Sequence, residues 1–285
     1  MTGAPEPSTA RIGATLDDKE QRLGLLLRAL GSVVVAFSGG VDSAYLAYAA
    51  RRELGENALS VTADSASYSE RHRQLALLVA REAGLRHEFI RTSELERPEY
   101  RANPIDRCYY CKQELFRRLT QLARERGLAC VVDGNNADDR GDHRPGRRAA
   151  AEFGVRSPLD EVGLRKEEIR ELSRRAGLPT WNEPASACLS SRIPYHSEVT
   201  DEKLRMIEQA EQVLFGLGFR VCRVRHHGET ARVEVAEPEM ARMVSPDVRS
   251  IVVNELKAIG FRYVSLDLQG YRTGSLNEGI RLRPA

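Results

Sequence analysis

The chain has 285 residues, of which 41% are hydrophobic and 29% charged, values typical of a folded, soluble enzyme with a sizeable core. These values exclude a disordered protein and a collagen-like or mucin-like one. No uncharged apolar stretch approaches the ~18–20 residues of a transmembrane helix. Residues 1–15 lack the apolar core of a signal peptide, so we expect a flexible lead-in and a cytoplasmic protein without membrane partners.

Basic and acidic residues nearly balance, with 43 of the former, 41 of the latter and a net charge of +2. Proteins that bind nucleic acid through bulk electrostatics usually carry a much larger basic excess. The charge therefore disfavours nucleic acid as a partner. Most of the basic residues are arginines, so recognition of an anion has to be argued at individual sites.

The first part of the chain alternates predicted strands with predicted helices. Apolar, β-branched runs separated by helical patterns predict βαβ units and a parallel sheet covered on both faces. The strands are expected at 33–37, 58–63, 87–92 and 130–132, and the helices at about 41–54, around 75–79, at 108–126 and at 166–176.

The pattern changes after a connector that is rich in Trp, Pro and Ser. A smaller α+β unit is expected there, with helices at 201–217 and 248–259 and strands at 220–226, 230–235 and 263–268. The predicted class is therefore α/β with a second, smaller α+β domain. Its predicted boundaries are 16–180 for the first domain, 181–199 for the connector and 200–285 for the second domain.

The string Ser38-Gly39-Gly40-Val41-Asp42-Ser43 follows the first strand directly and opens a helix. Ligands of open α/β sheets bind beyond the carboxyl ends of strands, where helix N-termini point. Gly39 and Gly40 let the backbone approach closely, and their amides with the helix dipole form a cradle for an anion. Asp42 would repel a bound phosphate unless a divalent cation lay between them. The string therefore predicts a site for a phosphate and a metal ion.

Five cysteines without a secretion signal argue against a disulfide framework. Cys108 and Cys111 are spaced i, i+3 at a helix start, where the dipole and basic neighbours are expected to favour thiolates. Cys188 lies in the connector among small polar residues. Together they suit a [4Fe–4S] cluster, a zinc site, a redox pair or plain burial, and spacing alone leaves these readings open. Cys130 and Cys222 are expected in the core.

Arg223 and Arg225 are two apart in a predicted strand, so both side chains lie on one face. Two guanidinium groups on one face suit a phosphate or a carboxylate, and Arg192 and Arg272 are further candidates. Glu211 falls on the apolar stripe of the helix 201–217, where a carboxylate needs a partner or a metal ion. A salt bridge between subunits is equally compatible, and Glu234 is a weaker companion.

The Ser-Gly-Gly-x-Asp-Ser string resembles the pyrophosphatase loop of the PP-loop ATP pyrophosphatases, which adenylate a substrate oxygen and release pyrophosphate. The resemblance implies that Ser38, Gly39, Gly40, Asp42 and Ser43 hold the pyrophosphate of ATP, with Mg²⁺ on Asp42. It also places Asp64 and Ser65 near the adenosine. The kinase-type loop G-x-x-x-x-G-K-[ST] is absent, which disfavours transfer of the terminal phosphate.

Further strings resemble the LarE family over residues 20–280. They are the turn Arg144-Pro145-Gly146, the connector A-S-A-C-L-S-S-R-I-P-Y, Arg223-Val224-Arg225 and L-D-L-Q-G-Y-R-T-G from Leu266. LarE proteins use ATP to adenylate pyridinium-3,5-biscarboxylic acid mononucleotide and replace carboxylate oxygen by sulfur, in making the nickel-pincer cofactor of lactate racemase. The resemblance implies a homo-oligomer and a small nucleotide substrate whose phosphate meets Arg192, Arg223, Arg225 and Arg272.

One departure from this family concerns the source of the sulfur. The better-known branch sacrifices a connector cysteine, and Ala187 stands at that position here. Cys108, Cys111 and Cys188 instead match a three-cysteine branch, in which a [4Fe–4S] cluster carries a sulfide supplied by a separate donor. The resemblance thus implies Cys188 as a catalytic cluster ligand, with sacrifice of Cys188 itself as the alternative.

Two other functions remain open on the sequence. Some tRNA thiolases also use three cysteines and a [4Fe–4S] cluster, but these normally carry added RNA-binding modules, and none is visible here. A nucleotide- or metal-sensing protein without turnover is the other rival. Release of pyrophosphate from ATP in the presence of substrate would exclude such a sensor.

Overall fold

The computed structural model describes residues 15–141, 145–184, 187–272 and 274–275. The predicted lead-in therefore lies outside the described residues except for Thr15. The same holds for Arg144, Ala185, Ser186 and Thr273 of the family strings. No helix among the described residues is long and apolar enough to cross a membrane.

The first domain is built on a four-stranded sheet in the order β3 (His87–Arg91), β2 (Ala58–Asp64), β1 (Val33–Ala36), β4 (Cys130–Val132). Every neighbouring pair is parallel, which confirms the predicted sheet. The central strand β1 is apolar throughout because helices cover both of its faces, as runs of valine in parallel strands indicate.

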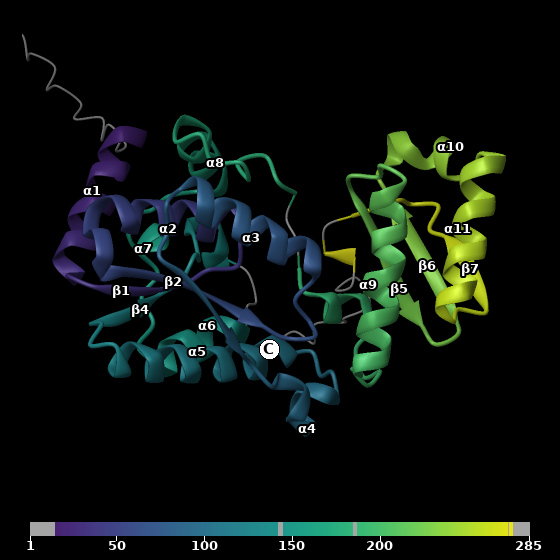
Figure 1. Ribbon diagram of the computed structural model, residues 1–285, viewed down its shortest axis with the longest axis horizontal. Coiled ribbons are helices and arrows are strands. Elements are labelled where there is room, and N and C mark those ends of the chain that lie inside the picture. The colour runs from purple at the N-terminus through teal and green to yellow at the C-terminus, as the bar shows by residue number, and fades with distance from the viewer. Residues whose placement is uncertain (1–14, 142–144, 185–186, 273, 276–285) are drawn as a thin grey trace, which may run out of the picture.

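Two groups of helices sandwich this sheet (Figure 1). One face packs against α1 (Leu16–Leu30), α2 (Val41–Leu54), α3 (Glu70–Glu82), α7 (Pro158–Glu161) and α8 (Lys166–Arg175). The other face packs against α5 (Arg107–Glu125) and α6 (Pro145–Glu152). The short helix α4 (Pro98–Arg101) precedes α5. Both layers exclude water from the strands and leave only the loops at the strand ends available for a ligand.

The second unit is an α+β layer, as predicted from the change in pattern after the connector. Its sheet has the order β5 (Cys222–His227), β6 (Thr230–Val235), β7 (Tyr263–Leu266), with β5 and β6 antiparallel and β6 and β7 parallel. The helices are α9 (Asp201–Gly216), α10 (Met240–Met243) and α11 (Pro246–Ile259), and they share one apolar core with the sheet.

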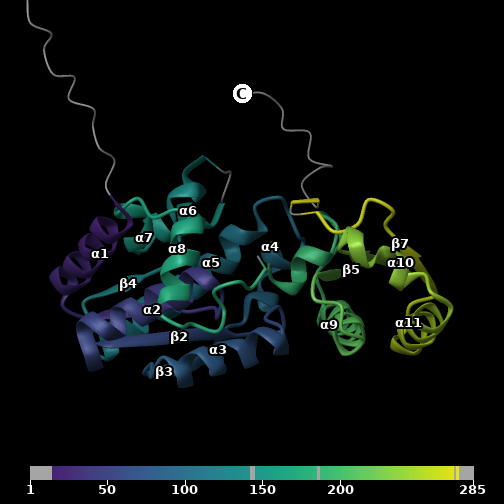
Figure 2. The same cartoon turned by 90° about the horizontal axis from the view of Figure 1, so that it is seen from above.

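The connector contains a short 3₁₀ turn, η4 (Leu189–Arg192), which directly follows Cys188. Figures 1 and 2 both place the C-terminal unit beside the first domain, at the end where α4 lies. The turn η4 contacts both α9 and β5. The connector is therefore held between the two units.

Candidate active site

The sheet order places a topological switch point between β1 and β4, at the carboxyl ends of these strands. From β1 the chain crosses to β2 on one side, and it later returns from β3 through α5 to β4 on the other side. The helices that follow β1 and β4 cover opposite faces of the sheet, and ligands of open α/β sheets bind at such a switch point. A Cβ atom on Gly134, just after β4, would lie 2.9 Å from the backbone nitrogen of Ser43. The two loops thus touch at backbone distance.

The loop after β1 has the geometry of a compact anion cradle. The Ser43 hydroxyl accepts from the Ser38 amide at 3.1 Å and donates to the Gly40 carbonyl at 3.1 Å. Gly39 has φ +76°, and a Cβ atom there would lie 2.9 Å from the Ala76 nitrogen, so only glycine fits. The predicted residues Ser38, Gly39, Gly40 and Ser43 are therefore brought together at the N-terminus of α2.

Asp42 lies in the first turn of α2, and its two carboxylate oxygens differ in their hydrogen bonding. Its Oδ2 atom accepts from Lys166 Nζ at 2.5 Å, whereas its buried Oδ1 atom has no hydrogen-bond partner among the described residues. Burial raises the pKa of Asp42, against the lowering effect of Lys166, and nearby Asp139 raises it further. A buried carboxylate oxygen without a partner is a good ligand for Mg²⁺, so this residue fits the predicted metal ion.

Asp64 and Ser65 lie at the end of β2, next to the strand that carries the cradle. Asp64 forms an ion pair with Arg73, and the Ser65 hydroxyl lies 3.1 Å from that of Ser67. Two residues that sequence reasoning missed also reach the cradle. Lys166 comes from α8, and the Tyr68 hydroxyl donates to the Ser38 carbonyl at 2.9 Å.

Cys108, Cys111 and Cys188 lie close enough to affect one another electrostatically. Burial, then the neighbouring Cys188, raise the pKa of Cys108, although its side chain keeps an exposed edge. Burial, followed by Glu94 and Cys188, also raises the pKa of Cys111. The sequence brings two of these thiols to the start of α5 and the third to the residue directly before η4, so the three lie in one region of the structure.

Two expectations about the cysteines need correction. The helix start and its basic neighbours were expected to favour thiolates at Cys108 and Cys111, but the net pKa shift at both is upward because desolvation outweighs Arg107 and Lys112. Cys222 is fully buried as expected, whereas Cys130 is only partly buried at the edge strand β4. No three His, Cys, Asp or Glu residues of the described chain are arranged to hold a single metal ion.

The candidate phosphate ligands differ in their surroundings. Arg192 Nε and Nη2 pair with both oxygens of Glu211 at 2.9 and 3.0 Å. Arg225 pairs in the same way with Glu234, at 2.9 Å for each bond. The buried carboxylates Glu211 and Glu234 therefore have arginine partners within the chain.

The other two candidates lie nearby in the second unit. Arg223 lies over the ring of Tyr271 and donates to the Cys222 carbonyl at 2.6 Å. Arg272 donates to the Gly270 carbonyl at 3.3 Å.

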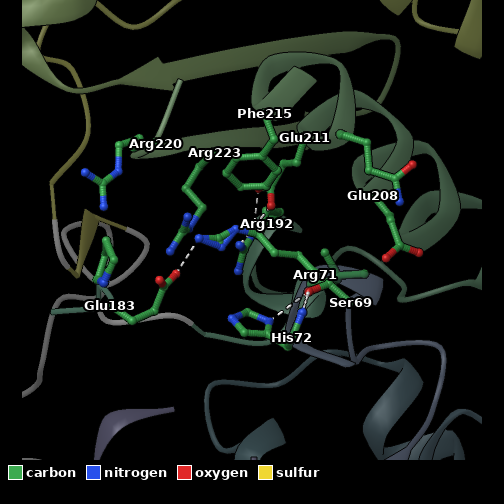
Figure 3. A pocket seen from close by; sticks show the side chains of 13 residues that line it. Ser69, Arg71, His72, Glu183, Arg192, Glu208, Glu211, Phe215, Arg220 and Arg223 are labelled. Carbon is green, nitrogen blue, oxygen red and sulfur yellow. Dashed lines mark hydrogen bonds and ion pairs between the residues drawn. The ribbon is translucent and has the colours of Figure 1, made fainter. Parts of the chain in front are cut away.

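A pocket lies where the start of α3, the connector, α9 and the start of β5 meet (Figure 3). Its basic side chains surround His72, whose pKa is lowered to about 4 by burial and by Arg192, Arg71 and Arg223. Burial and the neighbouring Arg192 also lower the pKa of Arg223. Such mutual repulsion between cations is relieved by a bound anion. The basic lining residues are Arg71, His72, Arg192, Arg220 and Arg223.

Known proteins resemble the chain in both of its parts. A family model described as asparagine synthase matches residues 23–158, the region of the parallel sheet. An uncharacterized protein of Synechocystis is 42% identical over 262 residues, covering 92% of this chain and 98% of the relative. A component of the glutamine-hydrolyzing GMP synthase of Archaeoglobus fulgidus is 25% identical over 210 residues, covering 65% of this chain and 64% of the relative.

One relative carries a specific name and matches almost end to end. The pyridinium-3,5-bisthiocarboxylic acid mononucleotide synthase of Lactiplantibacillus plantarum is 36% identical over 268 residues, covering 94% of this chain and 96% of the relative. That match includes the phosphate cradle, the connector and the second unit, so the resemblance expected from the motifs is confirmed. The chain belongs to the LarE family of PP-loop, ATP-dependent adenylating sulfurtransferases.

Proposed function

We propose that this chain adenylates a carboxylate of pyridinium-3,5-biscarboxylic acid mononucleotide, releases pyrophosphate and converts the acyl adenylate to a thiocarboxylate for nickel-pincer cofactor synthesis. The observation that carries the proposal is the pairing of a phosphate cradle with three neighbouring thiols in one chain of this family. The product named for the Lactiplantibacillus relative is a bisthiocarboxylic acid mononucleotide, which supports the substrate class.

The adenylation half uses the cradle after β1. Ser38, Gly39, Gly40 and Ser43 bind the pyrophosphate part of ATP, and Asp42 holds Mg²⁺ through its unpaired oxygen. The substrate carboxylate attacks the α-phosphorus, so a C–O–P link forms as pyrophosphate leaves. Asp64 and Ser65 are proposed to lie beside the adenosine because they end the neighbouring strand β2.

The sulfur half uses Cys108, Cys111 and Cys188 as ligands of a [4Fe–4S] cluster. The cluster, when bound, supplies a sulfide from an external donor. The three cysteines would bind such a cluster as thiolates, and iron would offset the cost of ionising Cys108 and Cys111, whose pKa burial raises. Attack on the acyl carbon forms a C–S bond, breaks the C–O bond and releases AMP.

The basic pocket is proposed to receive the phosphate of the mononucleotide. Arg192 and Arg223 line it directly, while Arg225 and Arg272 belong to the same unit. By family resemblance we also propose a homo-oligomer, which sedimentation of the purified protein would test.

Anaerobic purification of wild type, Cys188→Ala and Cys130→Ala tests the sulfur half. We expect four iron and matching sulfide per chain, with the absorbance of a [4Fe–4S] cluster, in wild type and in the control Cys130→Ala. Cys188→Ala should lose that signal but still release pyrophosphate from ATP with substrate, because its cradle is untouched.

Two outcomes would replace this proposal. A wild-type chain that binds no iron and loses the mass of one H₂S per turnover would make Cys188 a sacrificial donor. Tight, salt-sensitive tRNA binding would instead favour a tRNA thiolase.

A further inference from the structure

Three arginine side chains hold the backbone on both sides of Cys188. Arg192 Nη1 donates to the carbonyls of Ala187 and Cys188 at 2.6 and 3.0 Å. Two further arginines reach the connector from other elements. Arg107 Nη1 donates to the Ser190 carbonyl at 3.0 Å, and Arg225 Nη1 donates to the Ser191 carbonyl at 2.8 Å. Four carbonyls around one cysteine thus accept hydrogen bonds from three guanidinium groups.

Each of these guanidinium groups is buried and also donates to a second acceptor outside the connector. Arg192 is 2% exposed and held by Glu211, as Figure 3 shows. The same Glu211 accepts a hydrogen bond from the Val224 amide at 3.1 Å, so hydrogen bonds link Arg192 to the backbone of β5. Because a guanidinium group offers several donors in a rigid plane, it can bind a carboxylate with one edge and a carbonyl with another.

The remaining two are fixed in the same manner. Arg225 is 6% exposed and is held by Glu234 of β6, and Arg107 is 3% exposed and donates to the Asn103 side chain. Arg107 also directly precedes Cys108 on α5. The residue that holds the connector is therefore joined covalently to another of the three cysteines.

We propose that Arg107, Arg192 and Arg225 are positioning residues that set the Cys188 backbone against Cys108 and Cys111. This proposal deepens the function proposed above, since it matters only if the three thiols act together. It also gives Arg192 and Arg225 a different role from that of phosphate ligands, because their donors are directed at carboxylates and at the connector. The second unit then serves the sulfur site as well as the substrate.

A lysine at these positions keeps the charge but offers a single point of attachment, so it cannot hold both a carboxylate and a carbonyl in one plane. Hydrogen exchange of the Leu189 amide reports the connector directly, since that amide donates to the Ser67 carbonyl at 2.9 Å. In Arg192→Lys and Arg225→Lys, measured without iron or nucleotide, we expect this exchange to speed up at least tenfold. After anaerobic reconstitution, we expect iron per chain to fall at least twofold.

Arg232→Lys is the matched control. Arg232 pairs with the same Glu234 at 2.9 Å, and no bond from it to the connector is observed among the described residues. This variant should retain wild-type exchange and iron. If Arg192→Lys does not fold, Arg225→Lys and Arg107→Lys carry the test.

The proposal would be overturned if the lysine variants kept the wild-type exchange rate at Leu189 but showed a raised KM for the mononucleotide. That result would indicate that these arginines bind the substrate phosphate. Wild type without iron would defeat the cluster proposal but leave the exchange result standing, so the two failures are distinguishable.

Discussion

Asp42 lies in surroundings that are unfavourable for a carboxylate, and this bears on the metal-binding role that we propose for it. Its Oδ1 atom is buried without a partner, and burial raises the pKa of the carboxyl group even though Lys166 lies 2.5 Å from the other oxygen. In a chain selected for stability alone, an amide or an apolar residue would avoid this cost. The carboxylate is retained, we infer, because the unpaired oxygen is available to Mg²⁺.

Asp42→Asn should therefore separate stability from activity. The pKa of Asp42 in the folded state lies above the value of 3.8 for the unfolded chain. Between these two pKa values the folded state binds more protons than the unfolded state. The free energy of unfolding therefore falls as the pH rises through that interval. The variant should melt at a higher temperature than wild type at pH 7 without nucleotide, and the gain should vanish near pH 4.

Activity should move in the opposite direction. A metal ion contributes several kcal/mol to such a reaction, so Mg²⁺-dependent pyrophosphate release by Asp42→Asn should fall at least ~100-fold. The control Asp247→Asn, exposed at the start of α11, should leave pyrophosphate release at the wild-type rate. Equal pyrophosphate release by wild type and Asp42→Asn would show that Asp42 does not hold the metal ion.

Residues of the cradle were predictable because Ser38 to Ser43 form one contiguous string, whose spacing already fixes the local geometry. Lys166 was not predictable, since it lies 124 residues from Asp42 and reaches it only after α8 has packed on α2. The carboxylate partners of Arg192 and Arg225 were not predictable either, because they meet only after the second unit has folded. A pattern of two arginines on one strand face says that they point together, not which carboxylates they meet.

At the scale of elements, the site depends on how closely β4 approaches the start of α2. Gly134 leaves no room for a side chain, because a Cβ atom would lie 2.9 Å from the Ser43 nitrogen and 3.3 Å from the Asp42 carbonyl carbon. Backbone atoms cannot move aside as the tip of a flexible side chain can. A side chain at position 134 would therefore force the end of β4 and the first turn of α2 to move.

Gly134→Ala should cost about 1–3 kcal/mol in the free energy of unfolding, as overpacking usually does, and should weaken ATP binding at least tenfold. Urea denaturation and nucleotide titration measure the two effects. Gly216→Ala is the control, since nothing lies within 4 Å of a Cβ atom there and alanine favours the end of α9. Wild-type ATP affinity in Gly134→Ala would contradict the proposed contact between the loops.

The elements themselves were predicted unevenly. The helix 108–126 and the strand 130–132 agree with α5 and β4 to within one residue, because a long apolar stripe and a short valine run are both strong signals. Helix α1 was not predicted, although Thr15 and Asp18 form a reciprocal capping box that marks its start. The last strand ends at Leu266 rather than Leu268, since its pairing with β6 stops there.

At the scale of the molecule, the loop between β2 and α3 joins the proposed nucleotide site to the proposed sulfur site. The Tyr68 hydroxyl donates to the Ser38 carbonyl in the cradle at 2.9 Å. One residue earlier, the Ser67 carbonyl accepts from the Leu189 amide, next to Cys188, at 2.9 Å. The Ser67 side chain donates to Glu94 at 2.7 Å, and Glu94 in turn raises the pKa of Cys111. A rearrangement of the cradle would thus alter the surroundings of Cys188 and Cys111.

This connection predicts that ATP changes the sulfur site before any chemistry occurs. With ATP and Mg²⁺ but no substrate, we expect slower hydrogen exchange at Leu189 and slower alkylation of Cys188 in the iron-free protein, by about threefold or more. Tyr68→Phe removes only the hydroxyl, which donates to the Ser38 carbonyl and also lies 3.0 Å from the His72 carbonyl. ATP should still bind to this variant within about threefold of wild-type affinity, while the effect on Cys188 disappears. Tyr48→Phe is the control, because no hydrogen bond from its hydroxyl to the cradle or the connector is observed among the described residues. If ATP slows the alkylation of Cys188 equally in wild type and Tyr68→Phe, the two sites communicate by another route, and the loop between β2 and α3 only supports them.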